Sequence, residues 1–216
     1  MNVEYDIVLT WGSLILVLGY VVVLYFNKHK IQYWSLLQNK KRIEAANCIV
    51  EKDHIYFPKG YYFKFGYLKN KDKLPFSVIN EIRTNTFPIT ARINTNEIVF
   101  LLGLDEEKCI QLKDQANIIL TNPMDNWSLI CEEFLDTECS VELKERILQQ
   151  LEKNGIHPNE VAQIKKHIAS RMLFRTFISW EWQYYGQFDV LKVLWFLNSK
   201  KYWWTMDIAL RTHKKQ

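Results

Sequence analysis

The chain has 216 residues, with 28 basic and 24 acidic side chains that give a formal net charge of +4, and 48% of the residues are hydrophobic. Its 7 Gly, 5 Pro and 4 Cys exclude a collagen-like chain, a disulfide scaffold and a largely disordered protein. The length allows one or two domains plus a tail, and an aromatic content of 14% is typical of a protein with a generous core.

The first predicted element is a membrane span over residues 7–26, a run of twenty residues without a charge. A helix of that length measures about 30 Å, the thickness of a bilayer core. Glu4 and Asp6 precede the run and no small-residue cleavage pattern follows it, which argues against a cleaved signal peptide. The sequence therefore predicts a single-pass protein whose first partner is the lipid bilayer.

Basic residues follow the predicted span, and we expect their side chains to face the membrane. They are Lys28, Lys30, Lys40, Lys41 and Arg42. By the positive-inside rule, this charge predicts an inner (cytoplasmic) membrane protein with its N-terminus outside and its C-terminal body in the cytoplasm. Residues 31–46 hold no Gly or Pro, and their apolar spacing predicts a juxtamembrane helix.

From residue 47 to residue 102 the apolar period changes to two, which predicts short strands separated by turns. The predicted strands are 48–50, 54–57, 61–68, 74–82, 89–93 and 97–102. A helix should follow, because Asp105 and its acidic neighbours suit a helix N-terminus. Cys109, Leu112, Ala116 and Ile119 would then share one helical face.

The segment Leu74-Pro75-Phe76-Ser77-Val78-Ile79-Asn80-Glu81-Ile82 is similar to a strand that is common in bacterial pleckstrin-homology-like (PH-like) domains. Together with the order of short strands and one closing helix, it makes residues 47–120 resemble such a domain. The resemblance implies a binding scaffold, usually membrane-associated in bacteria, without catalysis.

The remainder, residues 121–216, is predicted to be a helical domain with a basic tail. Ser140 is a candidate N-cap for one helix, and Asn154-Gly155 is a helix stop. Pro158 then opens a second helix. Two sets of apolar residues mark the inward faces of this pair: Leu143, Ile147, Leu148 and Leu151, then Val161, Ile164, Ile168 and Met172.

Two alternative functions, catalysis or metal binding and DNA binding, are suggested by residues of this helical domain. Glu132, Glu133, Asp136 and Glu138 form an acidic cluster that could serve as acid and base or hold a divalent ion, although charge runs of this kind usually form a solvated helix end. Lys165, Lys166, His167 and Arg171 on the second helix suggest a DNA-binding helix-turn-helix. Against DNA binding, residues 104–160 carry thirteen acidic and five basic residues, a net charge of −8 that would repel phosphate.

The most unusual feature is a cluster of twelve aromatic residues between positions 174 and 204. Aromatic residues of this kind can anchor a core, dock on the membrane interface beside lysine residues, or form a surface for a protein partner. The binding candidates among them are Trp180, Trp182, Tyr185, Trp195, Trp203 and Trp204.

The sequence therefore predicts an α+β protein with one transmembrane helix, a small antiparallel β-meander closed by a helix, and an aromatic-rich helical module. The predicted boundaries are 1–30, 31–46, 47–120 and 121–216. The expected function is non-enzymatic binding or scaffolding of another protein at the inner membrane face. The alternatives are a membrane-proximal enzyme that uses the acidic cluster and a membrane-tethered DNA-binding regulator. No zinc spacing, nucleotide-binding loop or hydrolase motif occurs, so we expect no metal and no cofactor.

Overall fold

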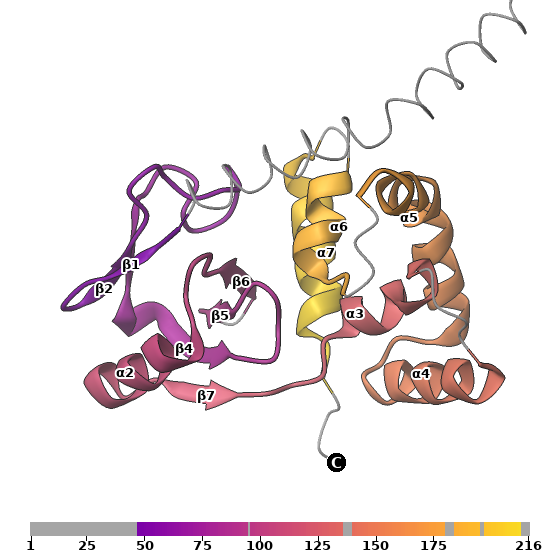
Figure 1. The fold of residues 1–216 in the computed structure, drawn as a ribbon, viewed down its shortest axis with the longest axis horizontal. Helices are drawn as coiled ribbons and strands as arrows, with labels where there is room; N and C mark the ends of the chain where they lie inside the picture. The colour runs from indigo at the N-terminus through magenta and orange to yellow at the C-terminus, as the bar shows by residue number, and fades with distance from the viewer. Residues whose placement is uncertain (1–46, 95, 136–139, 180–183, 195–196, 213–216) are drawn as a thin grey trace, which may run out of the picture. The chain divides into compact units, whose positions relative to one another are not determined.

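The computed structural model describes residues 47–94, 96–135, 140–179, 184–194 and 197–212 (Figure 1). Chain contacts divide the protein into two compact units, Met1–Lys40 and Lys41–Gln216, and every described residue belongs to the second. The described part of this unit is α+β and combines two small sheets with six α-helices.

The predicted fold class included a transmembrane helix, and this prediction is contradicted. Among the described residues, no helix is both long and apolar enough to cross a membrane. The longest described helix, α5 (Pro158–Ser179), has 22 residues but carries charges such as Glu160, Lys165 and Arg171, which are costly in lipid.

The predicted localisation, a single-pass inner-membrane protein with its N-terminus outside, is corrected on the same finding. The stretch 7–26, the helix predicted over 31–46 and the basic residues between Lys28 and Arg42 all lie outside the described residues.

The first sheet is a three-stranded antiparallel meander in the order β1–β2–β3. Its strands are β1 (Ile49–Val50), β2 (His54–Tyr56) and β3 (Lys73–Pro75). Ile55 lies opposite Leu74, and both side chains are fully buried. A slip of one residue would turn both side chains away from the core, so this pair fixes the register.

The chain between β2 and β3 forms a long loop instead of the strand predicted over 61–68. Tyr61 and Phe63 of this loop are nevertheless buried. Gly66 has a φ of +70°, and a side chain there would overlap the carboxylate of Glu97. The strand prediction was wrong because the alternating aromatic residues pack around a glycine turn instead of along a pleated strand.

The second sheet has four strands in the order β6–β5–β4–β7. Their bounds are β4 (Ile79–Arg83), β5 (Thr90–Ile93), β6 (Glu97–Phe100) and β7 (Ile119–Thr121). The pairs β4–β5 and β5–β6 are antiparallel, as predicted for a meander, but β7 joins β4 in parallel. The strand predicted over 74–82 is divided into β3, a 3₁₀ turn η1 (Phe76–Val78) and β4.

Helix α2 (Glu106–Ala116) connects β6 to β7. Its N-cap is Asp105, whose carboxylate accepts a hydrogen bond of 2.9 Å from the Lys108 amide. Cys109 and Leu112 are buried as predicted. The helix ends at Asn117, which is left-handed with a φ of +52°, so Ile119 belongs to β7 and is exposed instead of lying on the helical face.

The helical half follows β7 (Figure 1). Its elements are α3 (Asn126–Cys131), the 3₁₀ turn η2 (Glu132–Phe134), α4 (Val141–Lys153), α5, α6 (Gln187–Val193) and α7 (Ser199–Leu210). The predicted hairpin of α4 and α5 is confirmed, with the Ser140 hydroxyl accepting from the Leu143 amide and Gly155 at a φ of +79° between the helices.

Helix α3 is tied to the end of α7 through a buried asparagine, Asn126. Its amide nitrogen donates to the carbonyl oxygens of Ile208 and Arg211, both at 2.8 Å. Its amide oxygen accepts from the Asn154 side chain at 2.7 Å. The adjacent Trp127 indole donates to the Thr205 carbonyl oxygen at 3.0 Å. One short segment therefore holds α4 and α7 in place.

Replacing Asn126 with alanine should lower the free energy of unfolding by about 3 kcal/mol, because buried carbonyl groups and the Asn154 amide lose their partners. Urea unfolding of the full chain, followed by tryptophan fluorescence, measures this loss. Asn122→Ala is the control, because Asn122 accepts from Thr84 at an exposed site and its loss should cost under about 0.5 kcal/mol. Equal losses in the two variants would contradict the assigned role.

Candidate functional site

The acidic cluster predicted from the sequence lies only partly in the described chain. Glu132 and Glu133 belong to η2, whereas Asp136 and Glu138 are outside the described residues. Glu133 forms an ion pair with Lys165 of α5, and the hydrogen bond from this lysine lowers the pKa of the Glu133 carboxyl. A carboxyl that is held ionised suits an ion pair better than a general acid.

Around this ion pair is a hollow of about 100 Å³, which is smaller than a typical small-molecule site. It is lined by Leu129, Glu132, Glu133, Lys144, Ile147, Leu148 and Lys165. Two lysines therefore face the two glutamates. In the part of the chain that the structure describes, no three His, Cys, Asp or Glu side chains are grouped to hold a metal ion.

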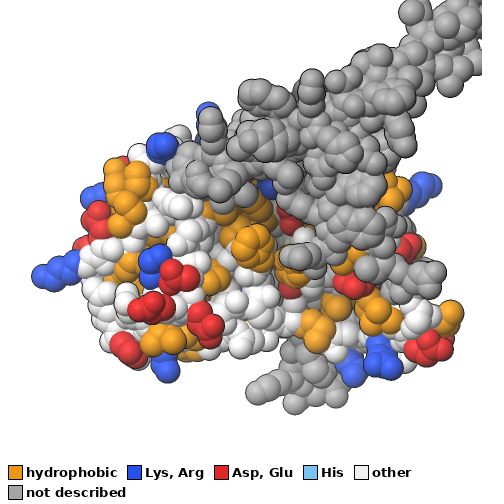
Figure 2. Space-filling model, in the orientation of Figure 1, with side chains coloured by type: hydrophobic (Ala, Val, Ile, Leu, Met, Phe, Trp, Pro, Cys, Tyr) orange, Lys and Arg blue, Asp and Glu red, His pale blue; other side chains and the backbone are white. Residues whose placement is uncertain are grey.

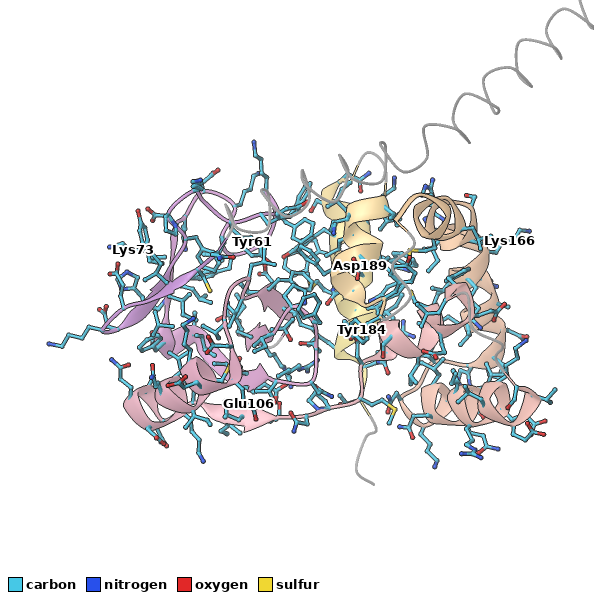
Figure 3. The ribbon with its side chains drawn as sticks, viewed as in Figure 1. Tyr61, Lys73, Glu106, Lys166, Tyr184 and Asp189 are labelled. Atoms are coloured by element: carbon cyan, nitrogen blue, oxygen red, sulfur yellow. The ribbon has the colours of Figure 1, made fainter. Side chains whose placement is uncertain are left out.

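The basic residues of α5, predicted as a DNA-reading set, have different surroundings. Lys165 pairs with Glu133, and Arg171 donates to the His167 carbonyl oxygen of its own helix at 2.9 Å. Lys166 is exposed on the outer side of α5 (Figure 3). The His167 ring stands edge-on to Trp204 of α7, with ring centroids 5.3 Å apart. Three of the four side chains predicted to read DNA therefore make contacts within the protein.

Three of the six aromatic binding candidates are described. Tyr185 is buried in the core, Trp203 is 36% exposed, and Trp204 is partly buried. Trp180, Trp182 and Trp195 lie outside the described residues. One of the described three is therefore a core residue, and the other two reach the surface to different extents.

Helix α7 has two distinct faces. Its inward face is buried and consists of Tyr202, Thr205, Met206, Ile208 and Ala209. We call the opposite side the outward face of α7; it carries Lys200, Trp203, Trp204, Asp207 and, just past the helix, Arg211. Large aromatic residues on a solvated helix face are typical of the anchors that dominate protein–protein contacts.

Beside this outward face is a hollow of about 460 Å³, which we call the α5–α7 groove. It is lined by Glu160, Gln163, Ile164, His167, Asn198, Lys200, Lys201 and Trp204. Trp204 forms a firm wall because its ring is also set edge-on against Trp127, with centroids 5.5 Å apart. The groove thus combines an apolar, aromatic wall with a polar rim.

A second hollow of about 290 Å³ also lies on α7 and is lined by Asn96, Trp203, Asp207, Leu210 and Arg211. Arg211 links it to the α5–α7 groove. One guanidinium nitrogen donates to both oxygens of Glu160 at 2.8 Å, and the other donates to Asp207 at 2.6 Å. These ion pairs hold α7 against α5 between the two hollows.

On the face shown in Figure 2, acidic side chains gather over α2. Hydrophobic, basic and acidic side chains lie side by side over α4, where Val141 is exposed. The hollow next to α4 measures about 100 Å³ and has no tryptophan among its lining residues, whereas the hollow beside the outward face of α7 measures about 460 Å³ and includes Trp204.

Sequence reasoning missed the buried carboxylate of Glu97 in β6. This residue is 2% exposed, accepts from the Tyr67 amide at 2.9 Å, and accepts from the Tyr202 hydroxyl of α7 at 2.8 Å. Burial raises the pKa of the Glu97 carboxyl. In the sequence, Glu97 follows a polar turn and therefore looks like a surface residue. The one local signal of its burial is Gly66, because a side chain at that position would overlap the Glu97 carboxylate.

Tyr61 completes the cluster around Glu97. Figure 3 shows Tyr61 on the part of the loop next to α6 and α7. Its hydroxyl accepts from the Phe100 amide at 3.1 Å, and burial raises the pKa of this hydroxyl. Both carboxylate oxygens of Glu97 accept hydrogen bonds from within the protein. This arrangement indicates a structural connection between β6 and α7 instead of a reactive site.

No family model, curated protein or solved structure matches this chain. The resemblance of residues 47–120 to a PH-like domain therefore stays a prediction.

Replacing Glu97 with glutamine should stabilise the protein near neutral pH. A raised pKa means that the folded state favours the protonated carboxyl, so the stability that Glu97 provides at low pH is lost as the pH rises through its folded-state pKa. The gain from Glu97→Gln should therefore grow with pH and vanish in acid. Urea unfolding from about pH 4, near the ordinary pKa of a glutamate, to about pH 8 measures this gain in the free energy of unfolding.

Glu106→Gln is the control, because Glu106 is an exposed carboxylate on α2 (Figure 3). A gain at neutral pH that is as large for Glu106→Gln as for Glu97→Gln would contradict the assigned effect of burial.

Proposed function

We propose that this chain is a protein-binding module and that the outward face of α7 is its contact surface. The single observation that carries the proposal is the pair Trp203 and Trp204, which stand at two hollows on one rigidly held helix. Tryptophan in a well-packed pocket is among the residues most enriched at binding hot spots. The function is thus binding or scaffolding, and the strand-rich part would serve as the PH-like scaffold that the resemblance implies.

The surrounding contacts support this use of α7. The inward face is anchored by the Tyr202–Glu97 hydrogen bond and by the bond from the Trp127 indole to Thr205. Arg211 fixes the end of the helix through Glu160 and Asp207. A helix held at both ends presents its outward side chains without a large ordering cost on binding, which favours affinity.

Photo-crosslinking in cells that make the protein tests the proposal. A photoreactive residue placed at Gln163, which is exposed and lines the groove, should crosslink a defined partner protein that mass spectrometry identifies. Trp203→Ala should reduce this crosslinking at least about tenfold, because loss of a hot-spot tryptophan costs 2 kcal/mol or more.

Two controls belong to this experiment. The photoreactive residue at Gln111, exposed on α2, should not capture the same partner. Ile119→Ala removes an exposed apolar side chain from β7 and should leave crosslinking from position 163 unchanged. Capture that survives Trp203→Ala and falls with Ile119→Ala would place the contact surface elsewhere and overturn the proposal.

A further inference from the structure

We propose that the loop between β2 and β3 is a second binding surface, and that it takes single-stranded nucleic acid. Lysines of the loop contact the phosphates, and partly exposed aromatic rings stack with the bases. This surface uses none of the residues of the outward face of α7, so the inference goes beyond the proposed function.

The loop is compact and closed at its base. It runs from residue 57 to residue 72, and we call it the lysine loop. The Phe57 amide donates to the Asp72 carbonyl oxygen at 2.7 Å and joins the two ends, as in an Ω-loop. The large apolar side chains that hold the loop to the core are Phe57, Tyr61, Phe63 and Leu68, all of them buried.

The outer surface of the lysine loop is basic. Every lysine of the loop is exposed, and so is the lysine that opens β3: Lys59, Lys64, Lys69, Lys71 and Lys73. Together with Asp72 they give residues 57–73 a net charge of +4, which equals that of the whole chain. Figure 2 shows basic side chains along the upper left edge of the molecule, over this loop.

Partners within the described chain do not neutralise these lysines. None of the five takes part in an ion pair between described residues. The adjacent acidic residues Glu51 and Asp53 are engaged by His54, at 3.1 Å and 2.6 Å. His54 and, more weakly, Lys73 lower the pKa of the Asp53 carboxyl, so the four lysines of the loop itself dominate the positive potential.

Aromatic rings alternate with the lysines along the loop. Tyr62, Phe65 and Tyr67 are each partly buried, so part of every ring reaches the surface. Tyr62 packs on Phe188 of α6, with ring centroids 5.3 Å apart. Phe65 packs on Tyr202 of α7, with centroids 5.5 Å apart. Rings that the core supports in this way are preformed surfaces on which bases can stack.

The ring of Tyr67 is open to a charged group from outside. The Lys71 ammonium stands 3.9 Å from the centroid of this ring, in a cation–π contact. Because Lys71 is exposed, a base can take its place on the ring while the ammonium moves to the neighbouring phosphate. The backbone of Tyr67 stays fixed, since its amide donates to the Glu97 carboxylate at 2.9 Å.

A lipid surface fits the lysine loop less well than a nucleic acid. A segment that binds a membrane inserts apolar side chains about 5–10 Å into the lipid. Exposed large apolar side chains occur elsewhere in the described chain, as at Phe87, but none lies between residues 57 and 73. A base needs no such insertion, because it stacks on a partly exposed ring from outside.

An acidic peptide would use only part of this surface. Its carboxylates would pair with the lysines, but the faces of the aromatic rings carry negative potential and repel them. A single strand of nucleic acid uses both features, since it has phosphates for the cations and bases for the rings.

The acidic part of the chain lies away from the lysine loop. Residues 104–160, with their net charge of −8, include α2 and the helices α3 and α4. Figure 1 shows the loop at the upper end of the strand-rich half, α2 at its lower end, and α3 and α4 in the helical half. The repulsion that argues against DNA reading by α5 is therefore weaker at the loop, because it falls off with distance and with salt.

Fluorescence polarisation with the full chain tests the inference. The probe is a fluorescein-labelled oligo-dT of about twelve nucleotides, a usual site size for single-strand binding. A strand of equal length without bases keeps the phosphates and should bind at least about fivefold more weakly, because stacking is lost. A duplex of equal length should also bind more weakly. Oligo-U in the same assay distinguishes RNA from DNA, and binding of either strand supports the inference.

The salt dependence of binding reports the number of phosphate contacts. For single strands the logarithm of affinity falls with the logarithm of salt concentration with a slope of about −0.7 per neutralised phosphate, so four lysines predict about −2.8. The variant Lys64→Gln, Lys69→Gln, Lys71→Gln should bind at least about tenfold more weakly, and its slope should be smaller by about 2.

The matched control removes three exposed lysines from α2, α4 and α5: Lys113→Gln, Lys153→Gln and Lys166→Gln. It changes the net charge by the same amount and should leave the affinity within about twofold and the slope unchanged.

Two variants of Tyr67 test the stacking. Tyr67→Phe keeps an aromatic ring and should retain affinity within about twofold, whereas Tyr67→Leu keeps apolar packing without a ring and should lose at least about fivefold. The strand without bases should bind both variants equally. If Tyr67→Leu does not fold, the comparison of strands with and without bases on the unaltered chain still decides the point.

Several outcomes would overturn the inference. They are no binding of oligo-dT or oligo-U, equal affinity for strands with and without bases, a duplex that binds as tightly as the single strand, and equal losses in the loop and control variants. Vesicles of phosphatidylglycerol and phosphatidylcholine that bind through the loop lysines, when the oligonucleotides do not, would assign the loop to a membrane. A peptide of alternating Glu and Asp that binds more tightly than oligo-dT would assign it to an acidic protein.

Discussion

The hydrogen bond between Glu97 and Tyr202 is the interaction on which the described arrangement depends. It joins a strand of the second sheet to α7 across 105 positions of sequence, at 2.8 Å and with both partners buried. A buried carboxylate is costly unless its oxygens are satisfied, and here the Tyr67 amide and the Tyr202 hydroxyl satisfy them. Because a displaced α7 would leave the Tyr67 amide as the remaining described partner of this carboxylate, the bond favours one orientation of the helix. That orientation places the exposed Trp203 and the partly buried Trp204 on the same side of α7.

The same chemistry recurs where α3 begins. Asp125 caps α3 by accepting from the Trp127 amide, and it also accepts from the Tyr184 hydroxyl. Burial raises the pKa of the Asp125 carboxyl, as it does for Glu97. Tyr184 and Asp189 lie near this junction (Figure 3). One carboxylate–tyrosine pair therefore joins β6 to α7, and the other joins the start of α3 to the segment before α6. Their directional bonds define these positions more narrowly than apolar packing alone would.

Features that depend on neighbouring residues were predicted correctly from the sequence, whereas features that depend on partners remote in sequence were not. The hairpin of α4 and α5 was predictable because Ser140, Gly155 and Pro158 act on the backbone next to them. The strand predicted over 61–68 does not form, because its aromatic residues pack into a core that other segments of the chain build. Trp203 and Trp204 were identified as candidates from composition, but their exposure depends on Tyr202, whose partner is remote in sequence. The groove could not be predicted, because it needs the packing of α5 against α7.

The net charge of +4 becomes informative only when intramolecular pairing is taken into account. Arg211 offsets Glu160 and Asp207, and Lys165 pairs with Glu133, so these side chains contribute little to the field that a partner experiences. The α5–α7 groove is therefore characterised by the apolar surface of Ile164 and Trp204 more than by the formal charge of the chain.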